Sequence, residues 1–240
     1  EVLKWINGTM KMTDEKLGRV KEIAFIGKVA ASLSHEIKNV LATINESLGL
    51  MGDLFMKADQ NKVPDLMRLI ELNMNMREQI KGGVEIVNRL NRFAHSMDEQ
   101  VAQSDLNNVV ALTVDIAKRL ARLKRVGLET KLADNPVNIQ MDPFKVEQIA
   151  FGCIEYLLNL PTKKNRITLA LEEIKGDAII IISNDSSNSD SPRGTDPIAE
   201  KSGSDMAFLI ALLKEMGGSI EFTPSSAGNK ITVSFPAKKS

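Results

Sequence analysis

Three polar residues, His35, Glu36 and Asn39, bring an imidazole, a carboxylate and an amide within little more than one helical turn. A neutral imidazole near pH 7 keeps a nitrogen lone pair that can attack a phosphorus atom. The adjacent carboxylate of Glu36 can accept the other ring proton and so fix the tautomer. The Asn39 amide can hold a water molecule or a phosphoryl oxygen without adding negative charge. These residue types at this spacing predict a histidine that carries a phosphoryl group.

The helix that must position these residues has an apolar seam with a spacing of three and four residues. It is sustained over more than four heptads, which is typical of a coiled coil or a helical bundle. The seam consists of Ile23, Ile26, Ala30, Leu33, Ile37, Val40, Ile44, Ser47, Met51 and Leu54.

With Ile37 on the seam, His35 falls about 140° around the helix from it, and Asn39 lies over His35 on the same outer face. Another protein could therefore reach the imidazole. Position alone leaves open that His35 is an ordinary exposed side chain.

A second apolar seam follows and predicts a second long helix. Its members are Leu66, Leu69, Asn73, Met76, Ile80, Gly83, Val87, Leu90, Ala94, Met97 and Val101. The polar stretch from Lys57 to Pro64 predicts the turn between the two helices. A single hairpin of this length would leave much of its apolar surface in water, so we expect a homodimer with a four-helix bundle. Gly82 and Gly83 could mark either a bend or a close helix contact.

From Ser104 onward the pattern predicts an α+β layer of helices on a mixed sheet. Ser104 or Asp105 can cap a helix that runs to about Arg125, and a second helix begins at Pro143. We expect the remaining helix at Met206 to Met216, ended by Gly217 and Gly218. Strands are expected at Leu128 to Leu132, Val137 to Met141, Arg166 to Ile174, Ala178 to Ser183, Ile220 to Thr223 and Lys230 to Phe235. Asp185 to Gly203, rich in Ser, Asp, Gly and Pro, predicts a long loop.

The segment from Gly27 to Asn39 resembles the H-box of sensor histidine kinases. The resemblance implies that His35 is the phospho-acceptor and that Glu36 is the base in autophosphorylation. It also implies that Asn39 acts in dephosphorylating a response regulator. The proline that usually follows this asparagine is replaced by Val40, so we expect the helix to continue without the common kink.

The end of the second long helix, around His95, resembles the end of the second bundle helix of the same family. The resemblance gives His95 no matching role, so we expect a surface or structural residue.

The resemblance extends over nearly the whole chain, since Asp142 to Ser240 follows the order of the family's ATP-binding domain. Its nucleotide motifs are degenerate. Gly152 and Tyr156 stand where the N-box carries asparagines, so the Mg²⁺-coordinating asparagine is missing. Where the family has Asp-x-Gly-x-Gly, only Asn184 or Asp185 could be a relic.

In the second glycine box only Gly203 remains, and Asp205 puts negative charge at the helix start, where phosphates would lie. The Ser-rich loop reads as a relic or as a nucleotide lid. We therefore expect no confident cofactor: ATP and Mg²⁺ are not expected in this chain, no metal site is predicted, and the partner receiver would supply Mg²⁺.

Composition limits the function classes. The 31 basic and 31 acidic residues cancel, and aromatic residues make up only 4%, which argues against a nucleic-acid partner. The single cysteine, Cys153, excludes an internal disulfide and fits a reducing compartment. No apolar stretch is long enough to span a membrane. We expect a cytoplasmic protein, and the chain could be a fragment of a longer one.

The sequence therefore predicts an antiparallel helical hairpin that forms a dimeric four-helix bundle, followed by an α/β sandwich of the Bergerat (GHKL-like) type. The predicted domains are 1–103, for dimerisation and histidine phosphotransfer, and 104–240, a degenerate ATP-binding domain. The predicted function is a phosphorelay between response-regulator receiver domains through His35. Two alternatives stay open: an autophosphorylating sensor kinase with a divergent pocket, and a non-catalytic dimeric scaffold that binds response regulators.

Overall fold

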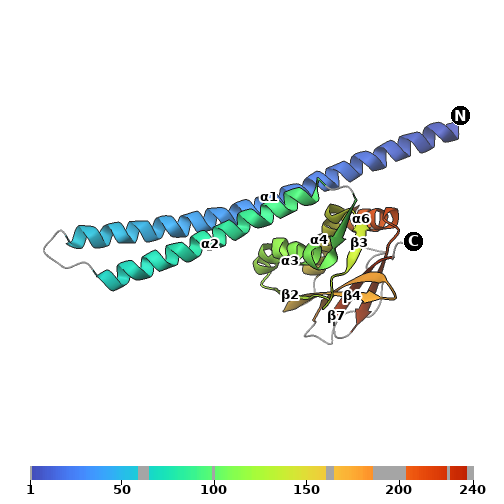
Figure 1. Ribbon diagram of the computed structural model, residues 1–240. Helices are drawn as coiled ribbons and strands as arrows, with labels where there is room; N and C mark the ends of the chain where they lie inside the picture. The colour runs from blue at the N-terminus through green and yellow to red at the C-terminus, as the bar shows by residue number, and fades with distance from the viewer. Residues whose placement is uncertain are drawn as a thin grey trace. The chain divides into compact units, whose positions relative to one another are not determined.

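The computed structural model describes residues 2–58, 65–98, 101–160, 165–185, 204–225 and 228–236. A helical hairpin comes first and a mixed α/β domain follows, which confirms the predicted fold class (Figure 1). The predicted turn at 57–64 and the predicted loop at 185–203 lie largely outside the described residues. In the part of the chain that is described, no helix is both long and apolar enough to cross a membrane.

The chain divides into two compact units. One unit is Lys28–Arg92, and the other combines Glu1–Gly27 with Phe93–Ser240. The predicted domain boundary at residues 103 and 104 stays a prediction.

Two helices of unequal length form the hairpin. Helix α1 runs from Val2 to Ala58, and α2 runs from Leu66 to Ser96. Helix α1 continues through Val40, as predicted from the missing proline. Helix α1 has 57 residues and α2 has 31, because α1 begins well before its seam and α2 ends before the last members of its seam.

The apolar seams are only partly buried. On α1, Ile23 is 68% exposed, and the buried face instead includes Phe25 and Val29 before it reaches the predicted Leu33. On α2, Leu72 and Ile86 are buried, although neither belongs to the predicted seam. A helix in a bundle meets more than one neighbour, so its apolar surface is wider than the seam of a two-stranded coiled coil.

The predicted continuation of α2 to Val101 was wrong. The helix ends at Ser96, whose hydroxyl oxygen lies 2.8 Å from the Phe93 carbonyl oxygen. Such local side-chain bonds compete with the helical ladder. Residues Ala102–Asp105 form strand β1, which pairs antiparallel with β3, Asn138–Met141. Strand β1 was not predicted.

The first two predicted helix starts in the α/β domain are confirmed. Asp105 caps α3, Leu106–Leu123, and accepts the N–H of Asn107 at 3.0 Å. Asp142 caps α4, Pro143–Asn159, and accepts the N–H of Lys145 at 3.2 Å. A carboxylate at this position satisfies a helix N–H that would otherwise lack a partner.

The main sheet has five strands in the order β2-β4-β5-β7-β6. Strand β2 is parallel to β4, and the other neighbours are antiparallel. Lys175 and Gly176 join β4 to β5, and both have positive φ, as a two-residue hairpin turn requires. The strands are β2 (Gly127–Lys131), β4 (Arg166–Ile174), β5 (Asp177–Asn184), β6 (Ser219–Ser225) and β7 (Gly228–Phe235).

Helices α3, α4 and α6 (Ser204–Glu215) lie against one face of this sheet (Figure 1). Alternate residues of β4, β5 and β7 are buried on that face, including Leu169, Ile180 and Val233. Aromatic rings extend this core: the Phe25 centroid lies 5.5 Å from that of Phe93 and 5.2 Å from that of Phe151.

The two neighbouring glycines of α2 differ in their surroundings, which makes them a matched pair. A methyl group on Gly83 would lie 3.3 Å from Val40 Cγ1, whereas one on Gly82 would meet nothing within 4 Å. Gly83 therefore marks a close helix contact. We expect Gly82→Ala to raise the free energy of unfolding by about 1 kcal/mol through helix propensity. Gly83→Ala should gain less or lose stability, because Val40 must move. Urea unfolding of both variants checks this, and an equal gain in the two would contradict the close contact.

Candidate functional site

The predicted phospho-acceptor lies in the described part of α1. His35 is exposed, and so is Asn39 one turn further on. The backbone carbonyl of Asn39 accepts a hydrogen bond from the Thr43 hydroxyl at 3.1 Å. The side chain of Asn39 is exposed. The two side chains thus occupy the outer helix face, where a docked protein could contact both.

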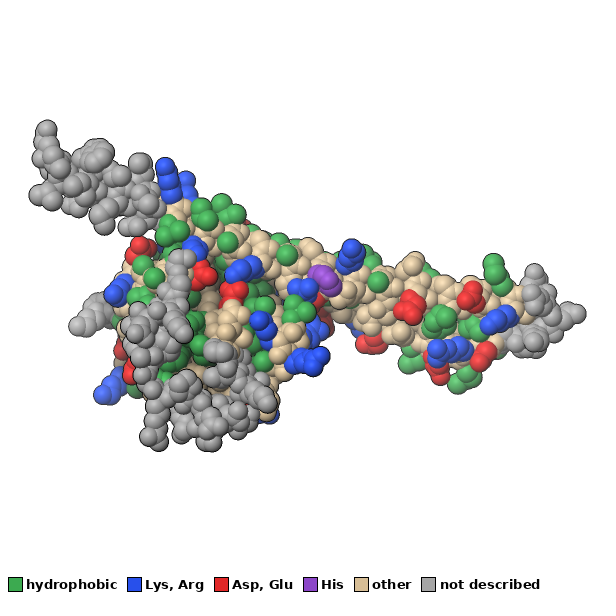
Figure 2. Space-filling model, turned by 180° about the vertical axis from the view of Figure 1, so that it is seen from behind, with side chains coloured by type: hydrophobic (Ala, Val, Ile, Leu, Met, Phe, Trp, Pro, Cys, Tyr) green, Lys and Arg blue, Asp and Glu red, His purple; other side chains and the backbone are tan. Residues whose placement is uncertain are grey.

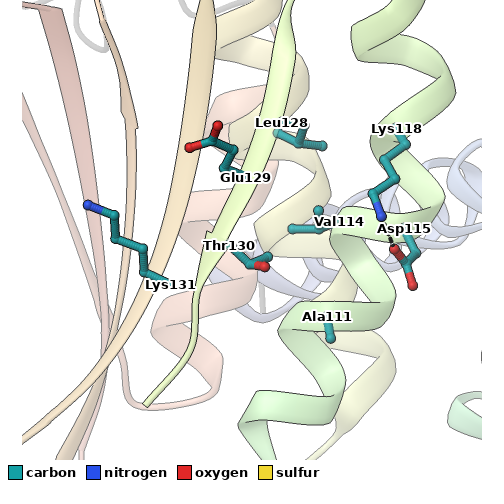
Figure 3. Close-up of a pocket in the computed structure, with 8 residues that line it drawn as sticks. All are labelled: Ala111, Val114, Asp115, Lys118, Leu128, Glu129, Thr130 and Lys131. Atoms are coloured by element: carbon teal, nitrogen blue, oxygen red, sulfur yellow. Dashed lines mark hydrogen bonds and ion pairs between the residues drawn. The ribbon is translucent and has the colours of Figure 1, made fainter. Parts of the chain in front are cut away.

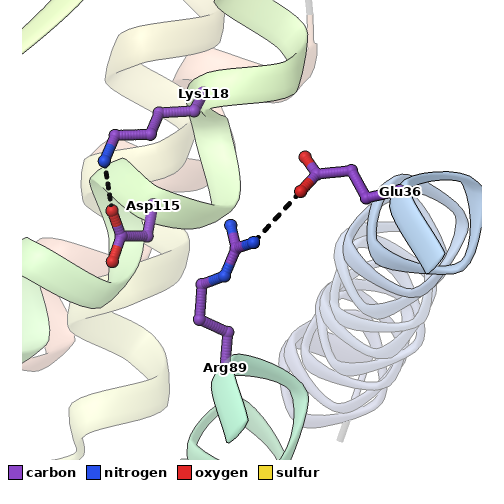
Figure 4. A network of polar contacts seen from close by, with 4 residues as sticks. All are labelled: Glu36, Arg89, Asp115 and Lys118. Atoms are coloured by element: carbon purple, nitrogen blue, oxygen red, sulfur yellow. Dashed lines mark hydrogen bonds and ion pairs between the residues drawn. The ribbon is translucent and has the colours of Figure 1, made fainter. Parts of the chain in front are cut away.

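The carboxylate of Glu36 is directed to the other helix of the hairpin. Its Oε2 lies 3.1 Å from Nη2 of Arg89 on α2 (Figure 4). The side chains of Glu36 and Arg89 are only 11% and 16% exposed. The pair joins residues 53 positions apart, and so it ties α1 to α2 at the level of the histidine.

The Glu36–Arg89 ion pair changes what the carboxylate can do. A charge that is held in a partly buried ion pair is oriented by its partner and is less able to turn toward a neighbouring ring. The predicted action of Glu36 on the His35 ring stays a prediction. Sequence reasoning missed Arg89, because nothing in the local pattern of α2 distinguishes this arginine from other polar residues.

His95, the other histidine of the chain, lies at the end of α2. Its Nδ1 is 3.5 Å from the carboxylate of Asp98, and both side chains are about 80% exposed. A surface position agrees with the expectation for His95. It also makes this residue a natural control for His35.

The two positions that the resemblance aligns with the N-box, Gly152 and Tyr156, have apolar neighbours in the structure. A Cβ atom on Gly152 would lie 2.4 Å from Leu209 Cδ1 of α6, and Leu209 is only 4% exposed. Leu209 therefore fills the space that an asparagine at position 152 would need. Tyr156, the second N-box position, stacks edge-to-face on Phe222, with ring centroids 6.1 Å apart.

The two candidate relic positions of the first glycine box, Asn184 and Asp185, accept hydrogen bonds from backbone N–H groups in or next to the main sheet. Asp185 Oδ1 accepts the N–H of Arg166 at 2.8 Å and that of Asn165 at 3.2 Å. Asn184 is buried, and its Oδ1 accepts the N–H of Asn229 at 3.0 Å. These side chains hold the ends of β4, β5 and β7 together.

The second glycine box is only partly described. Gly203 lies outside the described residues. Asp205, in the first turn of α6, pairs with Lys21 of α1. The carboxylate at this helix start therefore has a cationic partner within the chain.

Two pockets of about 300 Å³ lie in the α/β domain. One opens between α3 and the edge strand β2, where Leu128 and Thr130 face the helix while Lys131 points away (Figure 3). It includes the ion pair of Asp115 and Lys118, at 2.6 Å, which also appears in Figure 4. None of the predicted site residues lines it.

The second pocket lies at the ends of β4, β5 and β7. It contains the relic positions Asn184 and Asp185, and Arg166 and Lys230 add positive charge. No cluster of three or more His, Cys, Asp or Glu residues suited to a metal ion occurs within the described ranges.

Comparison with known proteins places these observations in context. No protein-family model matches the chain. Full-length ShkA, solved in complex with AMPPNP, superposes with a TM-score of 0.50 at 15% identity, over 86% of this chain and 45% of that one. The chain has the fold of a histidine-kinase core. The histidine kinase AdeS of Acinetobacter baumannii is also similar, with a TM-score of 0.49 at 15% identity over 85% of this chain and 98% of that one.

Curated sequences agree with a histidine-kinase core. The C4-dicarboxylate transport sensor protein DctS of Rhodobacter capsulatus is 28% identical over 141 residues, 59% of this chain. The sensor histidine kinase ZraS of Salmonella typhi is 22% identical over 222 residues, 86% of this chain. The chain spans 21% of the length of DctS and 44% of that of ZraS.

The ion pair across the hairpin gives a quantitative prediction. Glu36→Gln and Arg89→Gln should each lower the free energy of unfolding, and their double-mutant cycle should give an interaction energy of about 1–3 kcal/mol. The reason is that removing one partner leaves a charge with little access to water. Urea unfolding of the four proteins measures it.

The matched control is the exposed ion pair of Glu78 and Lys81 on α2, in which Lys81 Nζ lies 2.6 Å from Glu78 Oε1. Solvent screens this pair, so its cycle should give less than about 0.5 kcal/mol. Equal interaction energies for the two pairs would show that Glu36 and Arg89 do not form a special link.

Proposed function

We propose that this chain is a phosphorelay protein of two-component signalling, which accepts a phosphoryl group on His35 and donates it to response-regulator receiver domains. The observation that carries the proposal is the exposure of His35 on the outer face of α1, with the Asn39 amide one turn away. A nucleophile that must meet a second protein needs such a position.

The chemistry requires little from this chain beyond position. A neutral ring nitrogen of His35 attacks the phosphorus of a receiver aspartyl phosphate, the N–P bond forms, and the P–O bond breaks to release the receiver's carboxylate. The remaining ring proton stays on the other nitrogen. In-line placement and charge neutralisation carry most of the catalysis, and the partner's Mg²⁺ would supply the charge.

The second domain supports a relay that does not depend on bound nucleotide. Leu209 fills the space next to Gly152, and Asn184 and Asp185 make hydrogen bonds to backbone groups of the sheet. A nucleotide would have to compete for each of these positions. ATP-independent transfer is therefore the function that these contacts favour. The cytoplasmic location expected from the sequence is part of the same proposal.

Labelling distinguishes the three candidate functions. The chain is incubated with radiolabelled ATP alone, and separately with labelled phospho-receivers, beginning with any receiver encoded beside this gene. We expect label from a phospho-receiver on wild type and on His95→Ala, none on His35→Ala, and none from ATP alone. Because the chain contains only two histidines, label on His95→Ala must lie on His35 if it is phosphohistidine.

Two other results would contradict the relay. Label that enters from ATP alone and requires His35 would identify an autokinase. An absence of label on His35 from any receiver that binds the chain would leave a non-catalytic scaffold.

We also propose that two copies of the hairpin associate as a four-helix bundle. Within residues 28–92, apolar side chains remain at the surface of both helices, and Figure 2 shows hydrophobic side chains among the charged ones there. On α1 the heptad-spaced Leu41, Leu48 and Phe55 are 54–59% exposed. On α2 the exposed set includes Leu66, Ile70, Ile80, Val84 and Val87. A second copy would remove this surface from water.

Sedimentation equilibrium tests the dimer. Leu48→Lys should shift wild-type dimers toward monomers, because a charge would have to be buried between the hairpins. Glu46→Lys, on the same helix at an exposed position, should leave the dimer intact. A monomeric wild type at micromolar concentration would contradict the proposal.

A further inference from the structure

The end of α2 is attached to α4 by a buried pair of polar side chains. Ser96, the last residue of α2, is 9% exposed, and Glu147 of α4 is 1% exposed. The Ser96 hydroxyl oxygen lies 2.9 Å from Glu147 Oε2 and 2.8 Å from the Phe93 carbonyl oxygen. Both distances are those of good hydrogen bonds.

The number of protons shared among Ser96, Glu147 and the Phe93 carbonyl decides which group donates each hydrogen bond. A serine hydroxyl has a single proton, and a carbonyl oxygen can only accept. If Glu147 were ionised, it and the Phe93 carbonyl would compete for that one proton, and the bond of a buried oxygen would be weakened at a cost. An ionised Glu147 would leave the two acceptors to share one proton in a weaker three-centre bond, whereas both are full hydrogen bonds if Glu147 itself carries a proton and donates it to Ser96.

The surroundings of Glu147 also favour the protonated form. The pKa of Glu147 is raised to about 8, chiefly by burial; the hydrogen bond that Ser96 would donate to the ionised form lowers the pKa, and the Asp142 carboxylate raises it. Burial likewise raises the pKa of Asp142 above its ordinary value. Among the described residues, no ion pair joins Glu147 to a cation.

Charged groups on the neighbouring elements form ion pairs of their own. Lys145 lies 3.9 Å from Asp142 on α4 itself, and His95 at the end of α2 lies near Asp98. On α3, Asp115 pairs with Lys118. On α6, Asp205 pairs with Lys21 of α1.

We propose that Glu147 is an un-ionised carboxylic acid at neutral pH and that a proton-ordered chain, from Glu147 to Ser96 to the Phe93 carbonyl, fastens the end of α2 to α4 until alkaline pH removes the proton. Ser96 is the residue after which the chain leaves the second long helix and enters the α/β domain. The protonation of one side chain thereby controls the stability of this junction. The inference does not depend on the phosphorelay.

The sign of the pH effect follows from linkage. An unfolded glutamate has an ordinary pKa of 4.5, so the folded chain holds the Glu147 proton over a range in which the unfolded chain has lost it. Stability from this group is therefore greatest at low pH, falls as pH rises from about 4.5 to about 8, and is constant above that.

Infrared difference spectroscopy and stability measurements test the protonation. At pH 7 the wild type should show the C=O stretch of one buried protonated carboxyl, which disappears in Glu147→Gln. The unfolding constant of wild type relative to that of Glu147→Gln should rise about tenfold for each pH unit between 5.5 and 7.5. Glu155→Gln, on the same helix, should keep both signals. If no carboxyl band depends on Glu147 at pH 7, the proposal fails.

Amide hydrogen exchange tests the junction itself. The N–H groups of Met97 and Asp98 bond to carbonyl oxygens of the last turn of α2. After correction for base catalysis, their exchange should accelerate several-fold from pH 7 to pH 9 in wild type but not in Glu147→Gln. Ser96→Ala should exchange at pH 7 as fast as wild type at pH 9. A pH dependence that is the same in Glu147→Gln and wild type would overturn the control of the junction by this proton.

Discussion

The apolar faces that α1 and α2 bury against each other constrain the rest of the candidate site. Once Leu33 of α1 and Leu72 and Ile86 of α2 are removed from water, the helical period sets the direction of every other side chain. His35 and Asn39 are left on the outer face. The close approach of Gly83 to Val40 and the bond from Arg89 to Glu36 then hold the two helices in one register. The exposed imidazole is therefore a consequence of packing on the opposite side of the helix.

The α/β domain is held together by its hydrophobic core. Its stability rests on alternate buried residues of β4, β5 and β7 against three helices, and none of these contacts needs a nucleotide. Leu209 occupies the space beside Gly152, while Asn184 and Asp185 bond to the backbone of neighbouring strands. A domain can retain its architecture after its binding residues change, because the hydrophobic core and the binding site depend on different side chains.

Buried polar groups give the contact between the end of α2 and α4 a different character from the rest of the core. Apolar contacts among Phe25, Phe93 and Phe151 tolerate small shifts, whereas the bonds of Ser96 and Glu147 require a defined geometry and a defined number of protons. The place where the chain passes from α2 to the α/β domain is therefore sensitive to chemistry as well as to packing.

The sequence by itself determined the elements whose signals are local. The cap at Asp105, the helix start at Pro143 and the uninterrupted helix through Val40 were all predicted, because each depends on residues within a few positions of one another. The prediction for His35, Glu36 and Asn39 rests on a local signal of the same kind, since their types and spacing lie within little more than one helical turn.

Only the tertiary structure decided which apolar residues are inside and which polar groups meet. The α1 seam is at least partly buried from Leu33 to Leu54, but its first member, Ile23, is 68% exposed while Phe25 is buried. Burial depends on all the neighbours of a helix, and its own period does not reveal them. Arg89 is 53 residues from Glu36, and Glu147 is 51 residues from Ser96. No local pattern connects positions so far apart. Their partners are chosen by how whole elements pack, and the pairing of the unpredicted strand β1 with β3 likewise joins residues far apart in the sequence.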